Sequence, residues 1–323
     1  MRVGACLSLS GRYARFGTQA AAGLAAWRTL DGDAELVIED DGSDPARLVA
    51  AIRSVGARCD LLLGPYSTQL MRSAARALAD GDRVIWNHGG AGDDVCALLP
   101  GLIVSVLTPA SRYAEPFLDR LVGLPPRVPL RVVAGAGSFG RQVAAGALAR
   151  ARALGVEIVP GDAPAVGGEW DLFSAGAFEE DVTTVRRALG SPAPPRRVCS
   201  VAAGVREFAD EIGAADGIFG IAQWFPGSSS SVHVGPDEAS LLTALGGAAP
   251  DYPAVQAVAA AALAAACART AGDTSRRALW EAAAALDTRT LFGRFQIDSE
   301  TGAQVAHETV LVRWTAQELT ACR

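Results

Sequence analysis

The side chains that most often carry out catalysis are scarce in this sequence. Its 323 residues contain no lysine, which excludes Schiff-base chemistry, a P-loop lysine and a lysine general base. No serine lies in a G-x-S-x-G nucleophile elbow. The histidines His88, His233 and His307 are far apart, and an isolated histidine is more often structural than a general base. We therefore expect no catalytic residue and no enzyme, and retain His88 as a functional candidate because it follows a predicted strand.

The cysteines do not suggest a metal centre. No pair has the C-x-x-C spacing that metal or redox sites use, and the six are scattered along the chain. We predict isolated buried thiols, no metal and no cofactor. The six are Cys6, Cys59, Cys96, Cys199, Cys267 and Cys322.

One glycine-rich segment matches a cofactor motif. Residues 135–140 (GAGSFG) follow a predicted strand and open a predicted helix, and Glu157 lies about twenty residues further on. Glycines there would let backbone amides approach a pyrophosphate. The match lies outside the first strand–helix–strand unit, and Glu157 falls inside a predicted strand. Chance occurrence in a glycine-rich chain is therefore favoured, and an NAD(P)-dependent enzyme is kept as a remote alternative.

Polar and glycine-rich clusters recur directly after predicted strands. They occupy residues 8–11, 64–68 and 87–91. In an open α/β sheet, ligands bind beyond the carboxyl ends of the strands. Ser67 and Thr68 can also cap the helix that follows them. The same geometry would direct hydroxyl and N–H groups toward a carboxylate or carbonyl oxygen of a small ligand.

The elements that would position these clusters alternate between strand and helix. This order predicts an α/β fold with parallel, doubly wound sheets, in two lobes of similar size. Predicted strands cover 3–9, 34–39, 59–63, 83–86, 130–134, 156–159, 197–201 and 217–222. Predicted helices cover 18–29, 45–55, 69–79, 113–122, 141–154, 178–189, 205–212, 253–270 and 275–286.

The end of the chain departs from this alternation. Residues 226–231 are rich in glycine and serine and predict an exposed loop or a crossover. Residues 293–297 and 308–313 predict a hairpin whose turn is 298–302.

Charge and hydropathy limit the partners. The net charge is −6 and the pI is about 5.2, which argues against a nucleic-acid partner. The longest apolar run, 257–268, is shorter than the roughly 20 residues that span a bilayer, so contact with a membrane would be peripheral at most. The first strand starts at once, with no signal peptide before it.

Taken in order, several segments resemble type I periplasmic binding proteins, specifically the branched-chain amino-acid and amide group of solute receptors for ABC transporters. No single motif is specific, but the ordered set covers nearly the whole chain. The segments are 7–23 (LSLSGRYARFGTQAAAG), 40–45 (DDGSDP), 63–68 (LGPYST), 86–90 (WNHGG), 223–226 (QWFP), 251–257 (DYPAVQA) and 292–298 (FGRFQID).

This resemblance implies two Rossmann-like lobes joined by three crossovers, with a ligand in the cleft and closure by hinge bending. The crossovers are expected near 105–112, 225–237 and 287–293. Lobe 1 would then comprise 1–108 and 236–286, and lobe 2 would comprise 109–235 and 287–323.

The resemblance and the polar strand ends together give the candidate ligand-binding residues. In lobe 1 these are Ser10, Tyr13, Tyr66, Ser67, Thr68, His88, Gly89 and Gly90. In lobe 2 they are Ser138, Phe139, Ala203, Gln223 and Trp224.

One position departs from the amino-acid binders. These receptors hold the ligand's α-ammonium with an acidic residue of the second lobe, whereas the matching turn here offers Gln223. A buried ammonium without a counter-charge is costly, which favours a neutral amide, a urea-like molecule or a carboxylate.

Two functions follow from the resemblance. The first is a solute receptor that delivers an amide or amino-acid-like ligand to an ABC permease, periplasmic or extracytoplasmic if a signal peptide was removed. The second is a cytoplasmic ligand sensor that acts on a protein regulator.

Overall fold

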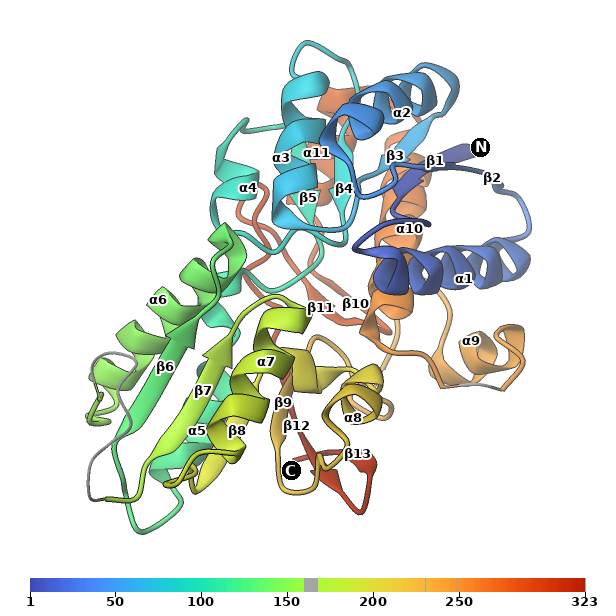
Figure 1. The fold of residues 1–323 in the computed structure, drawn as a ribbon. Helices are drawn as coiled ribbons and strands as arrows, with labels where there is room; N and C mark the ends of the chain where they lie inside the picture. Colours follow the sequence, from blue (N-terminus) through green and yellow to red (C-terminus); the bar gives the residue numbers. More distant parts are fainter. Residues whose placement is uncertain (160–167, 230, 248, 323) are drawn as a thin grey trace. The chain divides into compact units, whose positions relative to one another are not determined.

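The chain divides into two compact units, each formed by two separate segments. The computed structural model describes residues 1–159, 168–229, 231–247 and 249–322 (Figure 1). Unit 1 comprises Met1–Thr108 and Pro226–Glu308, and unit 2 comprises Pro109–Phe225 and Thr309–Arg323. The chain therefore passes between the units at 108/109, 225/226 and 308/309. The predicted loop at 226–231 includes Ser230, which lies outside the described residues.

The sheet of unit 1 consists of five parallel strands in the order β2-β1-β3-β4-β5. β1 lies near the centre, and five of its six residues are buried because helices cover both faces (Figure 1). The strands are β1 (Arg2–Leu7), β2 (Glu35–Asp40), β3 (Leu61–Leu63), β4 (Ile85–Asn87) and β5 (Ile103–Ser105). The sequence analysis missed β5, which is three residues long and abuts the predicted crossover.

Local sequence signals start several helices of unit 1. Asp44 caps α2 by accepting hydrogen bonds from two backbone amides, with Pro45 as the first helical residue, and Ser67 caps α3. The helices are α1 (Ala14–Asp31), α2 (Pro45–Arg58), α3 (Thr68–Ala77), α4 (Asp94–Ala97), α9 (Glu238–Ala244), α10 (Tyr252–Ala271) and α11 (Arg276–Ala284). The sequence analysis missed α4 and α9, which span four and seven residues.

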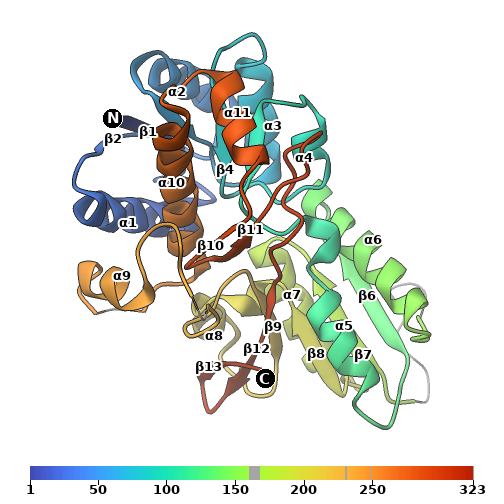
Figure 2. The same ribbon diagram turned by 180° about the vertical axis from the view of Figure 1, so that it is seen from behind.

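The alanine-rich helix α10 forms the centre of unit 1. It packs along α1, which Figures 1 and 2 show from opposite sides. A Cβ atom on Gly23 of α1 would lie 2.4 Å from the carbonyl oxygen of Ala254 of α10. The 20 residues of α10 are long and apolar enough to cross a membrane by length and composition alone, but 78% of its apolar window is buried inside the protein. Its hydrophobicity is that of a core helix.

The predicted hairpin of 293–297 and 308–313 is wrong. β11 (Gly293–Phe295) pairs with β10 (Thr288–Thr290), and β12 (Val310–Thr315) pairs with β9 and β13 in unit 2. The turn at 298–303 closes only a single bridge between Ile297 and Gln304. Adjacent apolar runs on either side of a turn suggested pairing, but the chain leaves unit 1 between them.

The same finding changes the predicted boundaries of the lobes. Residues 226–235 and 287–308 belong to unit 1 rather than to the second lobe, and the third passage lies at 308/309 instead of 287–293. The physical reason is that the β10–β11 hairpin and the turn after it are bonded within unit 1. Gln304, for example, donates to the Val106 carbonyl oxygen.

The sheet of unit 2 has six strands in the order β13-β12-β9-β8-β7-β6. β6 to β9 are parallel, whereas β12 and β13 are antiparallel additions at one edge. The strands are β6 (Leu130–Ala134), β7 (Asp171–Ala175), β8 (Arg197–Ser200), β9 (Phe219–Ala222), β12 (Val310–Thr315) and β13 (Glu318–Ala321). Its helices are α5 (Glu115–Val122), α6 (Ser138–Ala153), α7 (Phe178–Leu189) and α8 (Glu207–Ile212), with 3₁₀ turns at Ala110–Arg112 and Ala202–Gly204.

The predicted strand at 156–159 is reduced, within the described residues, to a single parallel bridge between Ile158 and Leu130 of β6. The full strand beside β6 is β7, which lies between β6 and β8 and was not predicted. All five residues of β7 are buried, but two of them, Asp171 and Ser174, are polar. Their polarity interrupted the apolar pattern that the sequence analysis relied on.

We predict that Gly23→Ala destabilises the protein by about 1–3 kcal/mol, because the added methyl group forces α1 away from α10. Gly137→Ala is the matched control, since a Cβ there meets no atom within 4 Å and the φ angle of −72° suits alanine. Chemical denaturation of both variants provides the measurement. Equal stabilities of the two variants would contradict the close helix contact.

Candidate functional site

In unit 1, the loops at the carboxyl ends of β1 and β2 are fixed by two neighbouring aspartates. The Ser8 hydroxyl donates to the buried Asp41 carboxylate at 2.7 Å, and the Ser10 hydroxyl donates to Asp40 at 2.6 Å. Burial raises the pKa of Asp41. Burial alone would raise the pKa of Asp40. Hydrogen bonds from the Ser10 hydroxyl and from three backbone amides outweigh it and hold this pKa below its usual value. The candidate Ser10 therefore serves this loop, with its hydroxyl committed to Asp40.

Aromatic rings gather beside these loops. The ring of Tyr66 stacks on Phe16 with a centroid distance of 4.4 Å, and Tyr13 lies 6.3 Å from it at a tilt of 47°. Tyr252, the first residue of α10, is hydrogen-bonded to Tyr66. Candidates Tyr13 and Tyr66 are thus in one cluster, whose member Phe16 was not predicted. Such rings offer flat apolar faces together with hydroxyl groups.

The loops after β3 and β4 are bound to each other through their backbones. The Ser67 amide donates to the Gly89 carbonyl oxygen at 2.9 Å, and the Gly92 amide donates to the Thr68 hydroxyl at 3.0 Å. A Cβ on Gly89 would lie 2.6 Å from the Cα of Tyr66, and one on Gly90 would lie 2.7 Å from Met71. Candidates Ser67, Thr68, Gly89 and Gly90 therefore form one packed edge, where the glycines are required by close approach.

Asn87, which the sequence analysis did not select, organises this edge. Its side-chain oxygen accepts from the Gly89 and Gly90 amides, and its amide group donates to Gly90 and to the Ser105 hydroxyl. Four hydrogen bonds from one buried side chain fix the loop that carries His88. The signal available in the sequence was an asparagine followed by His-Gly-Gly directly after a strand.

His88 is fully buried on this edge. Neither ring nitrogen has a hydrogen-bond partner within the described part of the chain. Burial lowers the pKa of His88 to about 4, with the Gly64 backbone acting weakly in the opposite direction. The imidazole is thus neutral near pH 7, when it can donate one hydrogen bond and accept another.

In unit 2, Gln223 follows β9 at the carboxyl edge of the sheet. It is 1% exposed, and its amide group donates to the Tyr113 hydroxyl. The ring of Phe139 meets Tyr113 edge-on at 5.4 Å. Candidates Phe139 and Gln223 are therefore brought together through Tyr113, which was not predicted and carries no distinctive sequence signal. Ser138 opens α6 next to Phe139 and is half-buried.

The remaining two candidates of unit 2 are buried. The carbonyl oxygen of Ala203 accepts from the Trp314 indole, so its backbone is engaged inside the unit. Trp224 is 2% exposed, and its indole nitrogen has no partner among the residues described. Ala203 thus contributes to packing within the unit. The indole N–H of Trp224 is a buried hydrogen-bond donor without an acceptor among the residues described.

A buried aspartate fixes the loop that contains Ala203. Asp181, in the first turn of α7, accepts from the Ser174 and Ser200 hydroxyls and from the Ala202 amide, at 2.6, 2.9 and 2.9 Å. Burial raises the pKa of Asp181 to about 6, and these hydrogen bonds oppose the rise. One carboxyl group therefore ties the ends of β7 and β8 to α7.

The glycine-rich segment 135–140 has a packing explanation. A Cβ on Gly140 would lie 2.4 Å from the Ala175 carbonyl oxygen, and one on Gly135 would lie 2.3 Å from the Glu180 carboxylate. That carboxylate accepts from the Ala136 and Ala177 amides. The Ala136 amide, which a pyrophosphate would need as a donor, is thus already hydrogen-bonded to Glu180. This argues against the dinucleotide interpretation.

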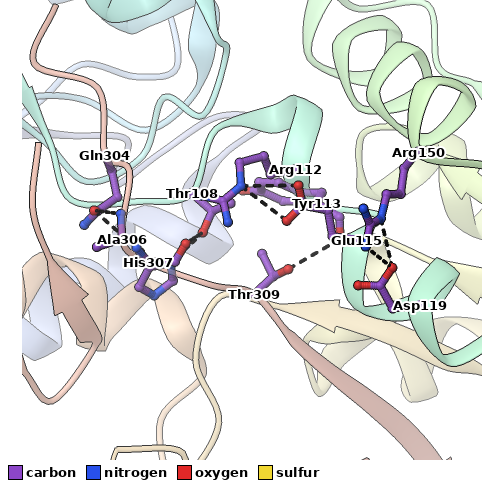
Figure 3. Close-up of polar contacts among 10 residues, drawn as sticks. All are labelled: Thr108, Arg112, Tyr113, Glu115, Asp119, Arg150, Gln304, Ala306, His307 and Thr309. Atoms are coloured by element: carbon purple, nitrogen blue, oxygen red, sulfur yellow. Dashed lines mark hydrogen bonds and ion pairs between the residues drawn. The ribbon is translucent and has the colours of Figure 1, made fainter. Parts of the chain in front are cut away.

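Two of the chain passages are secured by hydrogen bonds within the units. In unit 1, the Thr108 hydroxyl contacts Nδ1 of His307 at 2.6 Å (Figure 3). Nε2 of His307 lies 3.0 Å from the Phe292 carbonyl oxygen. In unit 2, the Thr309 hydroxyl donates to the Tyr113 carbonyl oxygen at 3.5 Å (Figure 3). His307 is thus structural, as is usual for an isolated histidine.

The cysteines are all unbonded, five buried and Cys322 partly exposed. Among the described residues, no group of three or more His, Cys, Asp or Glu is placed to hold a metal ion.

Comparison with known families decides what kind of protein this is. A family model described as "Periplasmic binding protein" matches residues 1–175, more than half of the chain. The chain belongs to this family. The resemblance noted in the sequence is thereby confirmed, and this periplasmic binding protein is a solute-binding receptor of a family made of ligand-binding proteins. No curated protein matches the chain.

Several solved structures have the same fold as this periplasmic binding protein. The leucine-binding protein LivK of Thermotoga maritima matches with a TM-score of 0.85 at 13% identity, over 100% of this chain and 98% of LivK. LivJ of Streptococcus pneumoniae, in complex with isoleucine, matches with a TM-score of 0.79 at 16% identity, over 99% of this chain and 98% of LivJ. A solute-binding protein of Rhodopseudomonas palustris, in complex with 4-hydroxybenzoate, matches with a TM-score of 0.82 at 16% identity, over 100% of this chain and 95% of that protein. The predicted α/β fold with parallel sheets is confirmed.

We predict that His88 makes the protein sensitive to acid. Its folded pKa lies below the unfolded value near 6.5, so its contribution to stability is lost as the pH falls from 6.5 toward 4. Relative to His88→Gln, the wild type should lose about 2–3 kcal/mol between pH 7.5 and 4.5. Urea denaturation at both pH values measures this, with the exposed His233→Gln as control. A loss of the same size in the His88 variant would refute the assignment.

Asp181 should act in the opposite direction. Its folded pKa of about 6 lies above the ordinary value of 3.8, so its contribution to stability is present at low pH and is lost as the pH rises through 6. Between pH 4 and 7.5 the wild type should lose about 2–3 kcal/mol relative to Asp181→Asn. The exposed Asp33→Asn serves as control in the same denaturation series. No pH-dependent difference from Asp181→Asn would count against the buried carboxyl group.

Proposed function

We propose that this periplasmic binding protein captures a small amide, urea-like or amino-acid-like ligand for an ABC transporter. Contacts would come from the carboxyl edge of each sheet, with hinge closure at the three chain passages. The receptor performs no chemistry of its own in this proposal. Several structural relatives are described as ABC transporter proteins, which supports delivery to a permease outside the cytoplasm.

The observation that carries the proposal is the nature of the two sheet edges. In unit 1, the edge carries the rings of Tyr13 and Tyr66 together with the buried, neutral His88. In unit 2, the edge presents Gln223 and Phe139 around Tyr113. Both edges are neutral at these positions, and they combine hydrogen-bonding groups with aromatic faces. This suits a small planar polar ligand.

The neutrality of Gln223 points to the ligand's charge. An α-ammonium group that loses its hydration needs a carboxylate partner, and Gln223 can offer only its amide oxygen. A ligand with a carboxylate or amide but without an ammonium group avoids this cost. The isoleucine bound by LivJ has such an ammonium group, whereas the 4-hydroxybenzoate bound by the Rhodopseudomonas palustris protein has none.

We predict that 4-methylpentanamide and 4-methylpentanoate stabilise the protein more than leucine, which differs from the acid by its ammonium group. A ligand at a hundred times its Kd adds about 2.7 kcal/mol of stability. Thermal-shift measurements with these three compounds, acetamide, urea and 4-hydroxybenzoate provide the test. The absence of any shift across the whole panel would overturn the proposed receptor function.

Gln223→Glu should shift this preference toward leucine, because it supplies the missing carboxylate. Gln317→Glu is the matched control, since Gln317 lies in the exposed turn between β12 and β13 of the same unit. An unchanged order of ligands in the Gln223 variant would show that this residue does not face the ligand.

A further inference from the structure

Unit 2 contains a pocket at the edge of its sheet away from Gln223. It has a volume of about 700 Å³ and is lined by the first residues of β8 and β9 and by Arg313 of β12. Figure 1 shows these strands side by side. Phe219, at the start of β9, is four residues from Gln223, on the order of 13 Å of extended chain. The pocket is therefore separate from the candidate ligand edge.

One side of the pocket has its charges balanced. Arg197 pairs with the buried Asp171 at 3.1 Å, and Arg196 pairs with Glu169 at 3.4 Å and with Asp171 at 3.6 Å. Yet Nε of Arg196, which lines the pocket, is buried without a hydrogen-bond partner in the described residues. Buried polar atoms in native proteins are normally satisfied, so this wall is expected to meet water or a polar ligand.

The other side of the pocket carries two arginines, Arg313 and Arg120. The guanidinium group of Arg313 lies 5.3 Å from the centre of the Phe219 ring and makes no ion pair with any residue described. Arg120 also lines the pocket, and both arginines act on the partly exposed Cys322 thiol, opposing the rise in its pKa that burial causes. Asp216, which also lines the pocket, accepts a hydrogen bond from the Ala316 amide.

We propose that this pocket binds a small organic carboxylate with an apolar body. Arginine is well suited to a carboxylate, which its planar fork binds with two parallel hydrogen bonds. The cavity is far larger than an inorganic anion and falls in the range of small-molecule sites. Leu124, Ile218 and Phe219 supply apolar walls beside the two arginines. The inference does not depend on the ligand proposed for the other edge.

Cys322 gives a local readout, because it is the only one of the six cysteines that is not buried. Its alkylation by iodoacetamide is followed by mass spectrometry of the carboxyl-terminal peptide, with benzoate, benzamide or inorganic phosphate present. Benzoate at ten times its Kd should slow alkylation by about tenfold. Benzamide, which has the same shape without the charge, and phosphate, which lacks the apolar body, should protect less.

Three variants locate the effect. Arg313→Gln should abolish protection by benzoate while Arg313→Lys retains part of it, and Gln223→Ala at the opposite edge should leave protection intact. Equal protection by benzamide or by phosphate, or full protection in Arg313→Gln, would overturn the proposal. So would loss of protection in Gln223→Ala, which would assign the effect to the other ligand edge. The contrast between benzoate and benzamide needs only the wild type, so the test does not depend on the folding of any variant.

Discussion

The close approach of backbone to backbone is the constraint on which this structure depends. At Gly23, Gly17 and Gly140, a single added carbon would lie within 2.4 Å of a carbonyl oxygen. These contacts set α1 against α10, α1 against the end of β1, and α6 against β7. Close-packed interiors tolerate no such insertion without movement of whole elements. The abundance of alanine and glycine thus has a structural use, since small residues allow helices to lie this near to their sheets.

This close packing places the loops, and buried polar side chains then fix them. Asn87 holds the loop after β4 in unit 1, and Asp181 holds the loop after β8 in unit 2. Asn87 satisfies three backbone groups, and Asp181 satisfies two serine hydroxyls and the Ala202 amide, all of which would otherwise be unpaired and wholly or partly buried. The other side chains at these edges are the aromatic rings, the neutral His88, and Gln223, whose amide group donates to Tyr113. A rigid edge with few free polar groups suits a receptor that must bind its ligand without reorganising.

The long elements were predictable because each has a strong local signal. The buried apolar strand β1, the capped helix α2 and the apolar helix α10 were all recognised within a few residues of their ends. Some short or polar elements were not. β5 spans three residues, and β7 contains the buried polar residues Asp171 and Ser174, whose partners Arg197 and Asp181 lie in other elements of the unit. Local patterns cannot report a polar residue that is satisfied by tertiary contacts.

By itself, the sequence determined the α/β alternation, the absence of lysine chemistry and the strand ends at which polar residues gather, because these depend on periodicity and residue type. Only the tertiary structure decided which of those residues meet. It brought Tyr66 onto Phe16, joined Gln223 to Tyr113 and committed Ser10 to Asp40. It also sent β12 to pair with β9, where the sequence suggested a local hairpin. Pairings between residues far apart in the chain are set by the packing of whole elements, which no local window contains.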